Sequence, residues 1–288
     1  MKTFEPALIV ESNLSIAWAR VFLHTFDGGE SESMTVAIRN FNGDVPDEDQ
    51  EIADGLVGQL RVTNEQLIRA GKSPIPTVEQ TALTIVPYGR WLHTNKPPIK
   101  ELSGWYLEKL LPRLRARSPK NSHGTYFERL TAFSGVRTIR GKQELRTVNQ
   151  LEFVTDWWKR RASKNLRPRQ SALQFACFDP VKDHTGSALA GFPCLQQVSL
   201  TYKEPGTLEI NAYYPTQYIF ERAYGNYLGL CQLGHVIAHE LGVHLTGLTC
   251  FVACPEFGPE SKESLKELAT FLRTHLKRLD GSKTSNAS

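Results

Sequence analysis

The sequence predicts a mixed α/β fold in which helices pack on a sheet. Two periodicities alternate along its 288 residues. Apolar side chains recur at every second position in residues 34–41, as in a strand, whereas residues 51–70 have the spacing of an amphipathic helix. With 40% hydrophobic residues, the chain can bury the core of one large domain, or of a domain with an extension.

Residues 1–115 are predicted to form an N-terminal region, which is a diverged part of the same domain or a subdomain. Its amphipathic helix ends where Gly71, Pro74 and Pro76 follow, because glycine and proline interrupt helices. The elements expected in this region are a helix over 13–23, a turn at 27–29, a strand over 34–41, the helix over 51–70, a strand-like run over 80–88 and a helix over 105–117.

Residues 116–279 are predicted to form a second region, followed by a flexible polar tail over 280–288. Polar and basic loops separate its periodic segments. The segments expected are a polar loop over 118–124, a helix over 148–161, a basic loop over 160–169, strands over 195–202 and 208–214, an apolar stretch over 227–242 and a helix over 259–279.

The composition predicts a cytoplasmic protein. The chain has no run of 18 apolar residues, and its first residues lack the apolar region of a signal peptide. Its five cysteines are an odd number at irregular spacing, which is typical of reduced thiols. The net charge of +4 permits an anionic small molecule as a partner, and neither a membrane nor nucleic acid is expected.

Cys194 is the most informative side chain, since it follows Pro193 at the start of the strand expected over 195–202. Proline fixes its own φ and restricts the residue before it, so the thiol is held in one backbone pose. This suits a nucleophile, which must point one way. The alternative is a packing role, because cysteine is among the most buried residue types.

Histidines on the apolar stretch raise the question of a metal site. A zinc helix of the pattern His-Glu-x-x-His would need its second histidine where Val243 stands. His235 and His239 are therefore expected to be structural, and no metal is predicted.

Several segments resemble the catalytic half of thymidylate synthase and the related dCMP hydroxymethylases. Pro193-Cys194 is similar to the family's Pro-Cys nucleophile, and Asn226 precedes a run, His235 to Gly242, that fits the pattern His-x-x-Ala-His-x-x-Gly. Upstream, Gly124-Thr125-Tyr126 resembles a Gly-x-Tyr substrate segment, and Cys177-Phe178-Asp179-Pro180 resembles an Ala-Trp-Asn-Pro strand end. The similarity covers roughly residues 120–250 and implies a thymidylate synthase-like sheet packed with helices.

The resemblance also implies roles for individual residues. Cys194 would attack a pyrimidine ring, and Asn226 would read the base edge with its amide, unless it serves only as a helix cap. Tyr126 would hydrogen-bond the ring or the region of the thiol, unless it only packs. In the family, two arginines hold phosphate in the partner subunit's site. Arg167 and Arg169 lie nearest that place, so a homodimer is expected, although a solvated basic loop is the alternative.

The family's Gln-Arg-Ser-x-Asp signature is replaced by Tyr214-Pro215-Thr216-Gln217-Tyr218. Pro215 therefore stands in place of a phosphate-binding arginine, and Tyr218 in place of the aspartate that holds folate. Arg222 stands in place of the family's glycine, against which folate lies flat. The resemblance implies methylenetetrahydrofolate as cofactor, but these replacements argue against an ordinary dUMP methylase.

The function predicted first is a divergent transferase that modifies C5 of a pyrimidine nucleotide or nucleoside by methyl or hydroxymethyl transfer, with Cys194 attacking C6. The second is a non-catalytic thymidylate synthase-like protein that binds a nucleotide or a partner. The third is an enzyme whose pocket takes another substrate.

Overall fold

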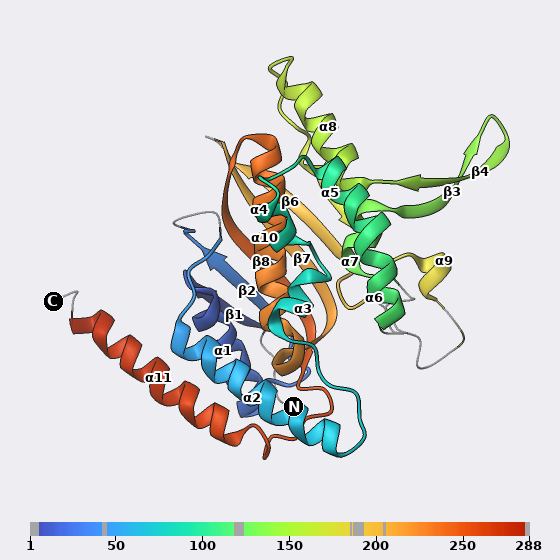
Figure 1. Cartoon of the computed structure of the whole chain (residues 1–288). Coiled ribbons are helices and arrows are strands. Elements are labelled where there is room, and N and C mark those ends of the chain that lie inside the picture. Colours follow the sequence, from blue (N-terminus) through green and yellow to red (C-terminus); the bar gives the residue numbers. More distant parts are fainter. Residues whose placement is uncertain are drawn as a thin grey trace. The chain divides into compact units, whose positions relative to one another are not determined.

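The computed structural model describes residues 6–41, 45–117, 124–184, 186, 193–203 and 206–285. The fold is mixed α/β, as predicted, with a six-stranded sheet in the order β1-β2-β8-β7-β6-β5 (Figure 1). β1 and β2 are parallel, whereas β2 pairs antiparallel with β8, and β6 pairs antiparallel with β5 and β7. The strands are β1 (Ala7–Glu11), β2 (Met34–Arg39), β5 (Gln174–Ala176), β6 (Gln197–Lys203), β7 (Thr207–Tyr218) and β8 (His244–Glu256).

The chain divides into two compact units that interleave along the sequence. Unit 1 comprises Met1–Ala82, Tyr214–Leu228 and Gly247–Ser288. Unit 2 comprises Leu83–Tyr213 and Gly229–Thr246. Neither unit is a continuous stretch of chain, because β7 and β8 each contribute residues to both.

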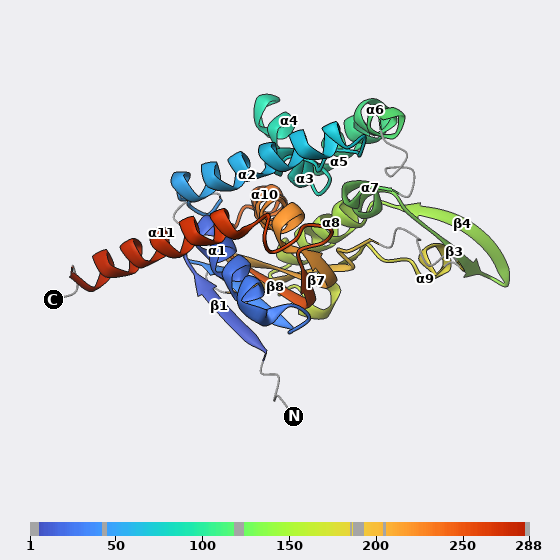
Figure 2. The ribbon, with the colours of Figure 1, turned by 90° about the horizontal axis from the view of Figure 1, so that it is seen from below.

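Unit 1 is built from helices whose starts are encoded by capping side chains. The side chain of Asn13 accepts from Ile16 N–H at the start of α1, and that of Asp49 accepts from Ile52 N–H at the start of α2. α2 and α11 lie side by side (Figure 2). The helices are α1 (Leu14–His24), η1 (Thr25–Gly29), α2 (Gln50–Arg69), α3 (Val78–Leu83), η5 (Ile219–Ala223), the first turns of α10 (Tyr224–Leu241) and α11 (Lys266–Ser285).

The C-terminal helix differs from the prediction at both ends. α11 begins at Lys266 rather than at position 259, and it continues to Ser285, past the expected start of a flexible tail at position 280. Asp280 accepts a hydrogen bond of 2.8 Å from Arg20 Nη2, which ties this part of α11 to α1. Beyond it, residues 286–288 of the expected tail lie outside the described residues.

The prediction of a strand over residues 80–88 is wrong, because α3 occupies the first part of this run and α4 (Tyr88–His93) begins at its end. Thr77 and Gln80 explain the first helix. Gln80 N–H donates to Thr77 Oγ1 at 3.2 Å, and Thr77 N–H donates to Gln80 Oε1 at 3.1 Å. This reciprocal pair is a capping box, which favours a helix over the strand that the apolar pattern suggests.

Gly225 lets α10 approach α3 closely. A Cβ at this position would lie 2.7 Å from both the Val78 carbonyl oxygen and Thr81 Cβ. We therefore expect Gly225→Ala to lower the free energy of unfolding by about 1–3 kcal/mol, because the contact includes backbone that cannot give way. Denaturant unfolding measures this.

Gly58→Ala is the matched control, since Gly58 lies inside α2 with open space around it. This variant is expected to gain about 0.5–1 kcal/mol from helix propensity. A stabilised Gly225→Ala variant would contradict the proposed close approach.

Unit 2 contains the remaining helices and a separate ribbon of two antiparallel strands, β3 and β4. The helix expected over 105–117 is found as part of a longer run from Ile99 to Arg117. Positions 118–123 of the expected polar loop lie outside the described residues. The helices are α4, α5 (Ile99–Trp105), η2 (Tyr106–Leu110), α6 (Leu111–Arg117), α7 (Tyr126–Thr131), α8 (Gln150–Ala162), η4 (Gln170–Ala172), α9 (Pro180–Asp183) and the rest of α10.

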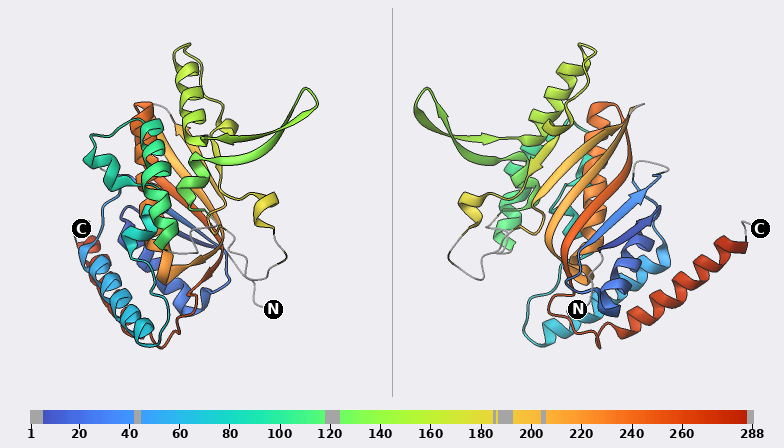
Figure 3. Two further views of the ribbon diagram at one scale, coloured as in Figure 1. Left: turned by 45° about the vertical axis from the view of Figure 1, so that its right-hand side comes forward. Right: turned by 180° about the vertical axis from the view of Figure 1, so that it is seen from behind.

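The ribbon consists of β3 (Phe133–Ile139) and β4 (Lys142–Val148). Arg140 and Gly141 form its two-residue turn, with φ of 50° and 79°. Positive φ at both positions is typical of the turn that matches the twist of a hairpin. The ribbon and the far end of α8 project from the rest of their unit (Figure 1, Figure 3).

Within the described part of the chain, every helix is too short or too polar to cross a lipid bilayer.

Candidate functional site

Cys194 is exposed and lies in unit 2, shortly before β6. The side chains on either side of it, Pro193 and Leu195, are buried. A buried residue on each side fixes the course of the backbone while the thiol between them faces solvent. The Cys194 thiol is therefore not packed in the core.

Backbone hydrogen bonds hold the segment after Cys194 in place. Leu195 N–H donates to Tyr126 Oη at 3.3 Å, and Gln196 N–H donates to the Tyr213 carbonyl at 3.0 Å. The carbonyl of Gln196 accepts from the N–H groups of Cys177 and Phe178, at 2.8 and 3.1 Å. These bonds anchor the thiol to α7, to β7 and to the strand end after β5. A fixed pose matters because small misplacements of a reacting group cost rate.

Three segments that the sequence analysis singled out therefore meet in unit 2: Tyr126, Cys177-Phe178 and Pro193-Cys194. The hydroxyl of Tyr126 contacts the backbone beside the thiol. Arg129, one helical turn further along α7, lies on the same side of the helix.

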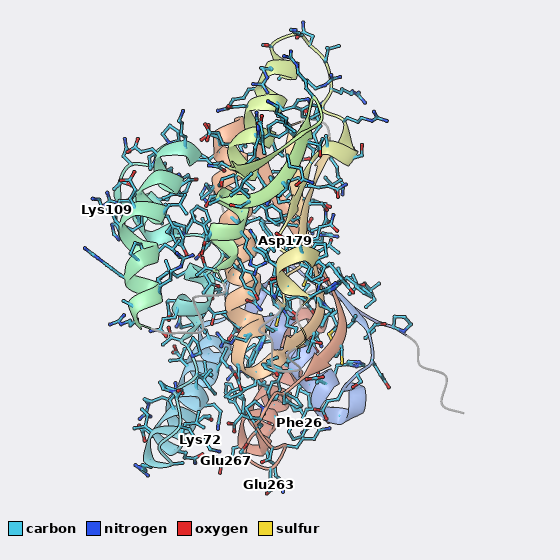
Figure 4. All side chains as sticks on the ribbon, turned by 90° about the vertical axis from the view of Figure 1, so that its right-hand side faces the viewer. Phe26, Lys72, Lys109, Asp179, Glu263 and Glu267 are labelled. Carbon is cyan, nitrogen blue, oxygen red and sulfur yellow. The ribbon has the colours of Figure 1, made fainter. Side chains whose placement is uncertain are left out.

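Arg129 secures the strand end after β5. Its Nη1 donates to the Cys177 carbonyl at 2.7 Å, and both of its Nη atoms donate to the Asp183 carboxylate at 2.7 Å. Asp183 also accepts from Asp179 N–H at 2.7 Å, at the start of α9 (Figure 4). Burial alone would raise the pKa of Asp183, but the hydrogen bonds from Arg129 outweigh it and lower that pKa.

The other described cysteines are less accessible than Cys194. Burial raises the pKa of Cys177 to about 12 and also raises the pKa of Cys250. Cys231 is buried as well. Cys254 is half-buried, and burial together with the nearby Glu256 carboxylate raises its pKa. Since the thiolate is the nucleophile, these environments disfavour reaction at Cys177, Cys250 and Cys254.

Asn226 lies in unit 1, on α10, and is only 3% exposed. It is not a helix cap, because η5 runs directly into α10 and places Asn226 inside a continuous helical segment. A buried amide within a helix needs polar partners, so a role beyond capping is left for its side chain. Cys194 and Asn226 belong to different units.

Arg167 and Arg169 are exposed in the loop between α8 and η4. The Arg167 carbonyl accepts a hydrogen bond of 2.9 Å from Arg161 Nε, so the start of this loop is tied to α8. Arg169 directly precedes η4. Both guanidinium groups are therefore presented to solvent, where they can meet another molecule.

The histidines of α10 that the sequence suggested contact side chains within unit 2. His235 Nδ1 is 2.7 Å from Tyr88 Oη, and the ring of Trp91 packs with its edge or face against both His235 and His239. The described residues contain no group of three or more potential metal ligands.

The described residues of unit 2 line hollows on its surface. One, of about 180 Å³, borders the Arg129 cluster and is lined by Gly124, Glu128, Arg129, Ala132, Phe133, Asp179 and Lys182. Another is a shallow hollow of about 610 Å³ over the strands β5, β6 and β7. Its lining side chains include Gln174, Gln197, Ser199, Thr201 and Asn211.

No model of a protein family matches the chain, and no curated protein matches it at a significant level. The fold and the site therefore define a class only in outline: a mixed α/β protein with an exposed cysteine whose backbone is anchored from three elements.

Proposed function

We propose that the protein is a transferase that modifies C5 of a pyrimidine, with Cys194 as the nucleophile. The observation that carries this proposal is the exposed thiol between buried neighbours, on a backbone anchored by Tyr126, Tyr213 and the strand end at Cys177. The resemblance to thymidylate synthase supplies the reaction class, and the meeting of three of its segments in unit 2 supports it.

The thiolate of Cys194 adds to C6 of the ring, and the electrons of the C5–C6 double bond move to C5 and on to the O4 carbonyl. C5 then bonds to the carbon of an activated one-carbon donor, whose leaving group departs with the electron pair of the broken bond. Loss of the C5 proton and departure of the thiolate from C6 restore the aromatic ring. In this scheme Tyr126 keeps the backbone beside the thiol in position.

The residues present do not fit the folate cofactor that the resemblance implies. Tyr218, where an aspartate is expected, is 38% exposed, and its ring lies 3.3 Å from a Cβ built on Gly258. A phenol at that position replaces the carboxylate that would accept from the pterin. The one-carbon donor is therefore a separate question from the attack on C6.

Attack on C6 is testable without knowing the donor. Incubation with 5-fluoro-2′-deoxyuridine monophosphate, with and without methylenetetrahydrofolate, is expected to give a covalent adduct by intact-protein mass spectrometry. Without a donor, the electron-withdrawing fluorine at C5 favours addition of the thiolate at C6. With a donor, fluorine cannot leave C5 as the proton does, so release of the thiolate is blocked. Peptide mapping should place the adduct on Cys194. Cys194→Ser should abolish it, and Tyr126→Phe should slow it by about tenfold through loss of positioning.

Cys254→Ser is the matched control, since Cys254 is the other cysteine that is not fully buried. This variant should form the adduct at the wild-type rate. A wild-type protein that forms no adduct under any of these conditions would favour the alternative, a binding protein without catalysis.

A homodimer that pairs through the sheet belongs to the same proposal. The polar side chains that line the hollow over β5, β6 and β7 are half-exposed or exposed. Arg167 and Arg169, both exposed, would then lie near the pocket of the partner copy. Light scattering at micromolar concentration is expected to give a dimer, and Ser199→Glu should shift it to a monomer by like-charge repulsion across the two-fold axis. A monomeric wild-type protein would rule this arrangement out.

A further inference from the structure

The charge of the chain is divided unevenly between its two units. Unit 2 contains 21 Lys and Arg against 11 Asp and Glu, a formal charge of +10. Unit 1 contains 13 Lys and Arg against 19 Asp and Glu, a formal charge of −6. The mild net charge of +4 therefore conceals a strongly basic unit, and a basic unit of this kind attracts polyanions.

Helix α8 of unit 2 carries basic side chains next to aromatic rings that are exposed or half-buried. Phe153 is 61% exposed, and Trp157, one turn later, is half-buried. The guanidinium of Arg161, a further turn on, lies over the Trp157 ring at 5.4 Å from its centroid. Residues four apart share a helix face, so these three side chains form one stripe along α8, here called the α8 stripe.

The surroundings of the α8 stripe are basic at its far end. Arg160 and Lys164 are exposed beside it. Arg161 is held in place by its hydrogen bond of 2.9 Å to the Arg167 carbonyl. The one acidic side chain on the same side of the helix is the exposed Asp156.

The ribbon β3–β4 leads directly into α8 along the chain. β4 ends at Val148, and Asn149 caps α8. Arg140, Lys142 and Arg146 are exposed on the ribbon, where Arg146 pairs with Glu144 at 3.4 Å, and β4 is exposed along its whole length. A two-stranded ribbon is marginal on its own, so a projecting basic ribbon is well suited to a partner that packs along it.

We propose that the α8 stripe and the ribbon β3–β4 bind single-stranded nucleic acid. Exposed aromatic rings offer faces on which unpaired bases stack, and the surrounding lysines and arginines pair with the phosphates. Arginine lying over a tryptophan adds a planar cation that stacks on a base in the same way. An acidic protein partner would use the charges but would leave Phe153 and Trp157 without a role.

Fluorescence anisotropy with a labelled oligothymidylate of about 20 nucleotides tests this directly. The wild-type protein is expected to bind it and to lose affinity steeply between about 50 and 200 mM salt. Phe153→Ala/Trp157→Ala should weaken binding by about tenfold or more at constant salt, through lost stacking. Arg160→Ala/Lys164→Ala should weaken it too, and should also flatten the salt dependence.

Two further variants sharpen the comparison. Asp156→Asn should tighten binding by about twofold, because it removes the acidic charge beside the stripe. Ile68→Ala/Arg69→Ala is the matched control, since it removes an exposed apolar and an exposed basic side chain from α2 of unit 1. It should bind like the wild type. Thermal melts of all variants show whether each one is folded.

Three results would overturn the proposal. The first is absence of binding to the oligothymidylate at low salt. The second is equal affinity for an abasic oligomer or polyglutamate of the same length, which would show that bases contribute nothing. The third is a change of oligomeric state by light scattering when Phe153 and Trp157 are replaced, which would show that a second copy of the chain covers the stripe.

Discussion

Replacing Arg129 by alanine is expected to lower the free energy of unfolding by about 3–5 kcal/mol. Its side chain is 12% exposed and its partner, Asp183, is 5% exposed. The substitution leaves the Asp183 carboxylate buried without its charged donor and removes the donor to the Cys177 carbonyl. Denaturant unfolding measures the loss, and faster alkylation of Cys177 would report the loosened strand end.

Arg115→Ala is the control for this prediction. Arg115 also pairs with a carboxylate, Glu128, at 2.6 Å, but its side chain is 46% exposed. It should therefore cost no more than about 1 kcal/mol. The pH dependence of the free energy of unfolding provides a second test of the Arg129 prediction, because the pKa of Asp183 is lowered in the folded state. The stabilisation by the Arg129–Asp183 pair is present at neutral pH and is lost as the pH falls through that folded pKa. The free energies of unfolding of the wild type and of Arg129→Ala should therefore approach each other in acid. Equal losses for both arginine variants would contradict this account.

The elements that the sequence predicted well are those whose ends are encoded locally. α1 and α2 begin within one residue of the expected positions, because Asn13 and Asp49 cap them. β2 begins at Met34, as expected from the alternation of its side chains. Capping and alternation depend on neighbours only a few residues away, so they can be read from one sequence.

The sequence did not predict elements whose apolar pattern is misleading or absent. Residues 80–88 carry apolar side chains in a run that fits a strand, yet the capping pair of Thr77 and Gln80 starts a helix there. The ribbon β3–β4 was not expected either, since β4 is exposed along its length. A strand that faces solvent on both sides has no alternation of apolar and polar residues to reveal it.

The same limit applies to the site. Cys194 could be singled out from its neighbours in sequence, whereas the network that positions it could not. Arg129 lies 48 residues from Cys177 and 54 from Asp183. Gln196 acts through its backbone, which carries no signal in its residue type. The division of charge was hidden for a related reason, because the two units interleave along the chain.

The last prediction concerns the substrate's phosphate. 5-Fluoro-2′-deoxyuridine and its 5′-monophosphate are expected to label Cys194 at rates within about threefold of each other, because each missing arginine contact removes a charge-assisted bond. The arginine that Pro215 replaces would favour the monophosphate by about 1.5–3 kcal/mol, on the order of tenfold or more. At the end of β7 the chain instead presents Pro215, which has no N–H to donate, and the half-exposed ring of Tyr218. Mass spectrometry of timed samples gives both rates.

The opposite change, adding a cation to β7, tests the same prediction. Pro215→Arg is expected to raise the preference for the monophosphate about tenfold, since one charge-assisted bond is restored. Thr216→Arg is the matched control, because neighbouring residues of a strand face opposite sides of the sheet. It should leave the preference unchanged. Turnover of dUMP with methylenetetrahydrofolate by the wild type should stay well below about 1 s⁻¹, the low end of ordinary enzyme rates. A wild-type protein that prefers the monophosphate tenfold or more, or that reaches this rate, would show that other side chains replace the lost arginine.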